Sequence, residues 1–114
     1  SRGIYYFRYP KSKKHLTKTF GLELAQFGIR CNCISPGSTN TAMQRNLWKK
    51  GQEETCMRRI IEGDLSKYKL GIPLNKLAQP EEIADIALFL CSPSASHVTM
   101  QNLLVDGGAS LGNA

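Results

Sequence analysis

The stretch GIRCNCISPG, residues 28–37, contains the signals that decide the fold. Gly28 follows a segment with helical periodicity and supplies a helix stop, because glycine enters left-handed backbone conformations at no steric cost. Residues 29–34 are short and β-branched at both ends, which predicts a strand. Pro36 and Gly37 end that strand, since this pair favours a turn. The stretch therefore predicts a helix end, a strand and a turn in succession.

Further elements are expected on both sides of this stretch. Apolar residues recur at helical spacing from Leu16 to Phe27, which predicts a helix over residues 10–26, with Pro10 in its first turn. Residues 38–75 are polar, and their loosely spaced apolar positions predict two short helices in a mobile excursion. The chain thus leaves the strand into a long loop before it folds back.

After the excursion the sequence predicts a helix, a strand and a turn. Pro80 opens a helix with two acids in its first turn, and Ser92-Pro93 closes it. Leu103–Val105 forms a last strand, which a turn at Asp106-Gly107-Gly108 ends. Helix, strand, loop, helix and strand in this order are typical of α/β folds with parallel strands. Parallel sheets need helices on both faces, and two strands with two or three helices cannot supply that cover, so we expect the edge of a larger sheet.

Charge and hydropathy exclude several classes of partner. Of the 15 basic residues, six precede Glu23, the first acid, and the other nine are matched by nine acids. The net charge of +6 is therefore local, and we expect no binding to nucleic acid. No apolar run reaches the roughly 20 residues that cross a bilayer, so we expect a cytoplasmic protein that does not bind membranes.

The cysteines and histidines show no metal-binding pattern. Cys31, Cys33, Cys56 and Cys91 form no C-x-x-C pair and no cluster with histidine, so we expect no metal site and interpret them as buried free thiols. A pair of disulfides is the alternative in a secreted protein. The two histidines, His15 and His97, have no partner at ligand spacing and are expected to be structural or exposed.

Six segments in chain order resemble the short-chain dehydrogenase/reductase family. They are Gly21-Leu22-Glu23-Leu24-Ala25, Gly28-Ile29-Arg30-Cys31-Asn32, Ser35-Pro36-Gly37, Thr41-Ala42-Met43, Pro80-Glu81-Glu82-Ile83-Ala84 and Val105-Asp106-Gly107-Gly108. The resemblance implies the C-terminal part of a Rossmann-like, doubly wound parallel sheet. Residues 1–114 would form a single partial domain, in which an atypical basic segment, 1–14, precedes the family-like part, 15–112.

The resemblance also implies NAD as the cofactor. Pro36 and Gly37 follow a strand at its carboxyl end, where open α/β sheets bind ligands. In the family the loop after them meets the nicotinamide carboxamide, so Thr39 would offer backbone contacts and Thr41 a hydroxyl. The alternative is a plain strand-ending turn with a threonine that caps the next helix. No glycine-rich phosphate-binding turn occurs in these residues, so we expect them to bind NAD poorly alone.

Finer features indicate the substrate. Residues 43–48, 71–74 and 97–102 resemble the branch of the family that makes 2,3-dihydroxybenzoate for siderophores. Gln44 and Arg45 would orient the substrate's carboxylate or hydroxyls, because a guanidinium fork suits a carboxylate. Met43 and Trp48 would wall its ring. A solvated Arg45 on a lid, and a hydrophobic contact that closes this lid, are the alternatives.

The catalytic pair of the family, Tyr-x-x-x-Lys, has two possible registers here. Tyr9 and Lys13 fit the motif, and a helical spacing of four places both on one face. The family, however, usually has a longer helical stretch before the Gly-Leu-Glu-Leu-Ala segment. Without a gap, Tyr6 becomes the catalytic tyrosine and Pro10 replaces the lysine. A third interpretation is that residues 1–14 derive from another reading frame.

Three functions remain open from the sequence. The first is NAD-dependent oxidation of 2,3-dihydro-2,3-dihydroxybenzoate, a small-molecule substrate, by an enzyme of which this chain would be a fragment inactive alone. The second is reduction of a 3-oxoacyl-carrier-protein or another carbonyl. The third is a non-catalytic module that pairs with a dehydrogenase subunit. The family further implies homo-oligomers.

Overall fold

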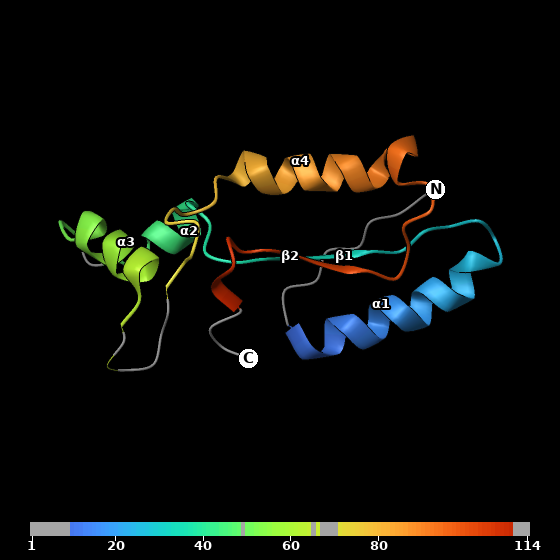
Figure 1. Cartoon of the computed structure of the whole chain (residues 1–114), viewed down its shortest axis with the longest axis horizontal. Helices are drawn as coiled ribbons and strands as arrows, with labels where there is room; N and C mark the ends of the chain where they lie inside the picture. Colours follow the sequence, from blue (N-terminus) through green and yellow to red (C-terminus); the bar gives the residue numbers. More distant parts are fainter. Residues whose placement is uncertain (1–9, 49, 65, 67–70, 111–114) are drawn as a thin grey trace. The chain divides into compact units, whose positions relative to one another are not determined.

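The computed structural model describes residues 10–48, 50–64, 66 and 71–110, with side chains from His15 onward (Figure 1). Its elements are α1 (Pro10–Ala25), β1 (Cys33–Pro36), α2 (Ala42–Arg45), α3 (Glu53–Glu62), α4 (Pro80–Cys91), the 3-10 helix η2 (Pro93–Ala95) and β2 (Asn102–Val105). The predicted helices at 10–26 and from Pro80, the two short helices of the excursion and the last strand are therefore confirmed.

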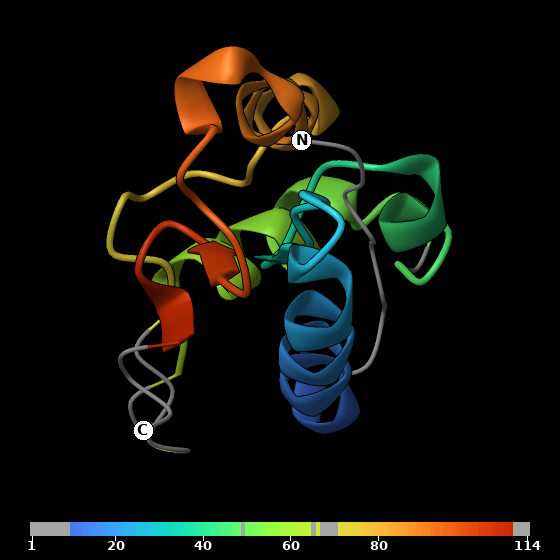
Figure 2. The same cartoon turned by 90° about the vertical axis from the view of Figure 1, so that its right-hand side faces the viewer.

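The chain divides into two compact units. The first, here called the sheet unit, comprises Ser1–Ser35 and Ala84–Leu104. The second, the loop unit, comprises Pro36–Ile83 and Val105–Ala114. Within the sheet unit, α1 and the main part of α4 lie on opposite faces of the strands, as both views show (Figures 1 and 2). The sheet unit therefore has a helix on each face of its two strands, which agrees with the predicted α/β fold class.

The two strands pair in parallel. The N–H of Cys33 donates to the carbonyl of Gln101 at 2.7 Å, and the N–H of Gly37 donates to that of Val105 at 3.0 Å, so both strands run in the same direction. Donors on a strand alternate between its two edges, so the nitrogen of Pro36 faces away from β2. Proline therefore fits inside β1 without the loss of a ladder hydrogen bond.

The prediction that a strand covers residues 29–34 is wrong at its start, since β1 begins only at Cys33. Side chains replace the ladder before that point. The N–H of Cys31 donates to Thr99 Oγ1 at 3.0 Å, while the Cys31 carbonyl accepts from the N–H of Met100 at 2.6 Å. The composition of residues 29–32 favours a strand, but Cys31 pairs with the segment before β2 partly through a side chain and not through a regular ladder of backbone hydrogen bonds.

Two buried polar residues connect this segment to the loop before β2, and one of them, Arg30, also reaches the C-terminal end of α4. Arg30, only 8% exposed, donates from Nη2 to the carbonyl of Leu90 at 2.6 Å and from Nη1 to that of Val98 at 3.1 Å. Asn32 donates to the same Val98 carbonyl and accepts from the N–H of Gln101. The guanidinium thus supplies a partner to the carbonyl of Leu90, which the end of α4 leaves unpaired.

The buried positions of α1 among its described side chains are occupied by small residues, Thr17 and Gly21. Thr17 is 1% exposed, whereas Phe20 and Phe27 on the periodic apolar face are 42% and 70% exposed. A Cβ at Gly21 would overlap Cγ of Met100, whose backbone has a φ of 59°. Glycine at this position therefore makes room for a side chain that projects from a left-handed backbone.

The cysteines are all free, but they differ in burial. Cys31 and Cys33 are fully buried, Cys56 is half-buried and Cys91 is exposed, so the prediction of buried thiols is confirmed for the first two and wrong for Cys91. Burial, with a smaller contribution from the charge of Cys33, raises the pKa of Cys31 and keeps it a thiol. The described residues contain no metal-binding group of three His, Cys, Asp or Glu residues. His15 and His97 are exposed, as expected.

Among the described residues, no helix has the length and apolar character needed to cross a bilayer.

We expect Arg30→Met to lower the free energy of unfolding by about 1–3 kcal/mol, because the buried carbonyl of Leu90 would lose its side-chain donor and that of Val98 would keep only Asn32. Denaturant unfolding measures this loss. The stability of Arg30→Lys should lie between those of Arg30→Met and the wild type, since one ammonium does not reproduce the two separated donors of the guanidinium. Arg58→Met on the exposed face of α3 is the matched control. An Arg30→Met protein as stable as this control would contradict the role of Arg30.

Candidate active site

The predicted cofactor and substrate residues all lie in the loop unit, which begins where β1 ends. Gly37 stands at this exit. A Cβ at Gly37 would lie 2.6 Å from Cβ and 2.9 Å from Cα of Asp106, so a side chain does not fit there. The space that a side chain at position 37 would need is therefore taken by the chain's own Asp106. A contact of Gly37 with a cofactor stays a prediction.

Thr39 is fixed by a parallel bridge to Ala78. The N–H of Asn40 donates to the carbonyl of Ala78 at 2.8 Å, and the N–H of Ala78 donates to the carbonyl of Ser38 at 3.1 Å. The hydroxyl of Thr39 donates to the carbonyl of Gly37 at 3.0 Å. These bonds hold the loop after β1 in one extended conformation, with Thr39 at its centre.

Thr41 is the N-cap of α2. Its Oγ1 accepts from the N–H of Gln44 at 3.2 Å, which is the capping role that the sequence left open as an alternative. A hydroxyl that accepts one hydrogen bond keeps a hydrogen that it can donate. Capping is therefore compatible with a further contact from Thr41 to an acceptor group.

Helix α2 and the turn after it carry the four predicted substrate residues. Arg45 is exposed, and its Nη1 donates to Oδ1 of Asn40 at 2.7 Å. Gln44 and Trp48 are half-buried, while Met43 is 55% exposed. Because the partner of Arg45 is a neutral amide, the guanidinium is oriented without being neutralised. The sequence reasoning missed Asn40, although an Asn close to a predicted anion-binding Arg is a signal for such a contact.

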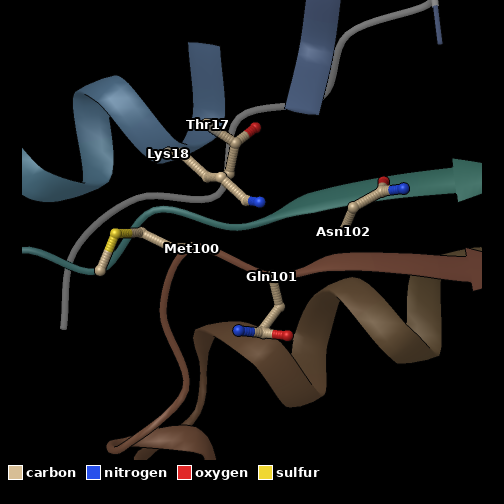
Figure 3. A pocket seen from close by; sticks show the side chains of 5 residues that line it. All are labelled: Thr17, Lys18, Met100, Gln101 and Asn102. Carbon is tan, nitrogen blue, oxygen red and sulfur yellow. The ribbon is translucent and has the colours of Figure 1, made fainter. Parts of the chain in front are cut away.

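Two cavities among the described residues are lined by residues other than the predicted ones. In the loop unit, a cavity of about 260 Å³ is lined by α3 and Asn75. In the sheet unit, a cavity of about 320 Å³ is lined by Thr17, Lys18, Met100, Gln101 and Asn102 (Figure 3). Figure 3 shows Thr17 and Lys18 on α1 across from the other three residues. Neither lining includes a residue of the loop after β1. We place the candidate site at that loop because the predicted cofactor and substrate residues lie in it and in α2.

The predicted catalytic residues cannot be positioned. Tyr6 and Tyr9 lie outside the described residues, and of Lys13 only the backbone, in the first turns of α1, is described. Pro10 opens this helix, as predicted. The choice between the two registers of the motif therefore stays a prediction.

Comparison with known proteins identifies the family. A family model described as enoyl-(acyl carrier protein) reductase matches residues 11–110. A solved short-chain dehydrogenase family protein from Francisella tularensis superposes with a TM-score of 0.73 at 30% identity, over 88% of this chain and 40% of the other. This chain belongs to the short-chain dehydrogenase/reductase family. Its two strands thus belong to the parallel sheet of the family's Rossmann-like fold, and α1 and α4 are helices that flank this sheet.

Other members of the family are also similar. A 2,3-dihydro-2,3-dihydroxybenzoate dehydrogenase of Bacillus subtilis is 56% identical over 96 residues, which cover 84% of this chain and 36% of the relative. A vibriobactin-specific enzyme of the same name from Vibrio cholerae is 53% identical over the same shares of both chains. The chain therefore spans just over a third of the length of these curated relatives.

A solved structure also bears on the cofactor of the family. The structure of a 7α-hydroxysteroid dehydrogenase complexed with NADH and 7-oxoglycochenodeoxycholic acid superposes with a TM-score of 0.66 at 34% identity, over 86% of this chain and 34% of the other. Membership of this dehydrogenase family implies a nicotinamide cofactor.

We expect Thr41→Ala to weaken the cap of α2 by about 1 kcal/mol, which corresponds to an about fivefold faster exchange of the Gln44 amide hydrogen. Amide hydrogen exchange followed by NMR measures the effect. Thr41→Ser keeps the accepting oxygen and should leave the exchange rate close to that of the wild type. Equal exchange in the alanine and serine variants would show that the hydroxyl does not hold this turn.

Proposed function

We propose that this protein oxidises 2,3-dihydro-2,3-dihydroxybenzoate to 2,3-dihydroxybenzoate with NAD, in siderophore biosynthesis. The observation that carries the proposal is the identity of 53–56% to two enzymes of that name. Because the aligned stretch has 96 residues in a chain of 114, it includes residues 19–96 and hence the entire excursion. The similarity therefore covers the segment that carries the predicted substrate residues.

The chemistry of the substrate matches the side chains of α2. The dihydrodiol has a carboxylate, two hydroxyls and an apolar ring. Arg45 would bind the carboxylate, and its orientation by the neutral Asn40 leaves the full positive charge for this contact. Gln44, whose amide both donates and accepts, would bind a hydroxyl. Met43 and Trp48 would cover the ring.

The loop after β1 would hold the nicotinamide end of the cofactor, NAD, which accepts the hydride when bound. A carboxamide has both donors and an acceptor, and Thr41 can still donate a hydrogen bond while it caps α2. Thr39 would contribute backbone contacts from its bridged position. Pro36 and Gly37 would set the direction in which the loop leaves the strand.

Proton transfer would fall to a tyrosine in the N-terminal segment. Tyr9, with Lys13 to lower its pKa, or Tyr6 in the other register, would remove the hydroxyl proton as the hydride leaves the substrate carbon. The reaction then balances, since the dihydrodiol and NAD⁺ give the catechol acid, NADH and one proton. Members of the family commonly form oligomers, and we expect homo-oligomers here.

The matching family model is named for an enzyme that acts on acyl-carrier-protein substrates, which favours a second candidate, the reduction of the 3-oxo group of an acyl chain on a carrier protein. Both candidates can be tested on the full-length protein. We expect NADH to form with 2,3-dihydro-2,3-dihydroxybenzoate and NAD⁺, and no NADH or NADPH to be consumed with acetoacetyl-carrier protein. The opposite pattern would refute the dihydroxybenzoate proposal. Inactivity in both assays would leave a non-catalytic module as the better interpretation.

In the active protein we expect Arg45→Ala to raise the KM for the dihydrodiol about tenfold with a smaller effect on kcat, because one charge-assisted contact to the carboxylate is lost. The same diol without its carboxylate should show no such difference between variant and wild type. Arg58→Ala removes an exposed guanidinium from α3 and serves as the matched control. Equal effects on both diols would contradict the assignment of Arg45.

A further inference from the structure

Asp106 organises the turn that follows β2. Its Oδ1 accepts from the N–H of Gly108 at 3.0 Å, and its Oδ2 accepts from the N–H of Ser110 at 3.0 Å. Gly107 and Gly108 have φ values of 63° and 91°, which side chains disfavour. A single carboxylate thus closes a turn whose backbone only glycine adopts readily. This turn, residues 106–110, is here called the C-terminal turn.

The C-terminal turn packs on the segment that leads the chain back from the excursion, residues 71–78, here called the return segment. The carbonyl of Gly107 accepts from the N–H of Leu74 at 3.1 Å. A Cβ on Gly107 would lie 2.7 Å from Cγ2 of Ile72, which is 6% exposed, and a Cβ on Gly108 would lie 3.1 Å from Cγ of Pro73. A side chain at Gly107 or Gly108 would therefore crowd the return segment.

The return segment in turn contacts both other parts of the excursion. At its start, the N–H of Ile72 donates to the carbonyl of Ile61 in α3 at 2.8 Å. At its end, Ala78 pairs with Ser38 and Asn40, and Asn40 holds the guanidinium of Arg45. Continuous hydrogen bonding therefore leads from the return segment to the proposed carboxylate ligand.

Asp106 also touches the beginning of the excursion. Its Cα and Cβ occupy the space where Gly37 would carry a side chain. The residue that closes the C-terminal turn therefore stands between the point where the excursion leaves β1 and the segment by which it returns. A loop whose two ends meet at one residue depends on that residue for the closure of its base.

We propose that Asp106 is a positioning residue, whose carboxylate fixes the base of the excursion and thereby the geometry of the substrate residues on α2. The expected effect on the substrate rests on the proposed function, whereas the contacts of Asp106 at the base are independent of it. Asp106 is ionised in this role. Hydrogen bonding from the Ser110 side chain lowers the pKa of its carboxyl and outweighs the opposing effect of burial. Hydrogen bonds from the backbone N–H groups of Gly108 and Ser110 lower this pKa further.

The two acceptors of the carboxylate make the proposal testable by graded substitution. Asp106→Asn keeps one acceptor and loses the other, while Asp106→Ala loses both. Asp85→Asn, on the exposed surface of α4, removes the same charge elsewhere and is the matched control. Amide hydrogen exchange of Leu74, Gly108 and Ser110 by NMR reports on the base, and KM and kcat for the dihydrodiol report on the substrate residues.

We expect exchange at Leu74 to rise on the order of tenfold in Asp106→Ala and less in Asp106→Asn, with the Asp85→Asn protein unchanged. KM should rise in the same order, with a smaller effect on kcat. Exchange at Leu74 as slow as in the control would overturn the proposal, and so would faster exchange with an unchanged KM. A wild-type protein inactive on the dihydrodiol would refute the proposed function, and exchange would then decide whether Asp106 anchors the base.

Discussion

The contact of the Arg30 guanidinium with the carbonyls of Leu90 and Val98 is the interaction on which the sheet unit depends. It joins the start of β1 to the end of α4 and to the loop before β2. Asn32 adds a second pair of bonds to this loop. Together the two side chains fix which residues of β1 and β2 face each other, because a slip by one residue would leave several buried polar groups unpaired.

The pairing of the strands determines which residues meet at their carboxyl ends. Gly37 donates to Val105, so the next residue, Asp106, comes to lie against the exit of β1. Here the excursion begins, and the C-terminal turn meets the return segment. The loop that carries the candidate substrate residues thus has a base made of strand ends. Its outer part is a short helix, α2, that its own cap maintains.

Local signals in the sequence predicted the elements well, but they did not predict the contacts between them. Apolar periodicity predicted α1 and α4, and the Asp-Gly-Gly triplet predicted the turn after β2. The late start of β1 has no local signal, because it results from hydrogen bonds between Cys31 and residues remote in the sequence. The same holds for the site. Thr41 as a cap follows from its position before a helix, whereas the fit of Gly37 to Asp106 depends on strands that are far apart in the chain.

The pairing of Met100 with Gly21 has a consequence for how this chain can change over evolutionary time. Met100 occupies a left-handed backbone conformation, at a cost of about 1 kcal/mol or more for a residue other than glycine, and its side chain fills the space above Gly21. Any side chain introduced at position 21 meets this obstacle. Alanine at position 21 is therefore accommodated more easily once Met100 has been replaced, so the order of the two substitutions is constrained.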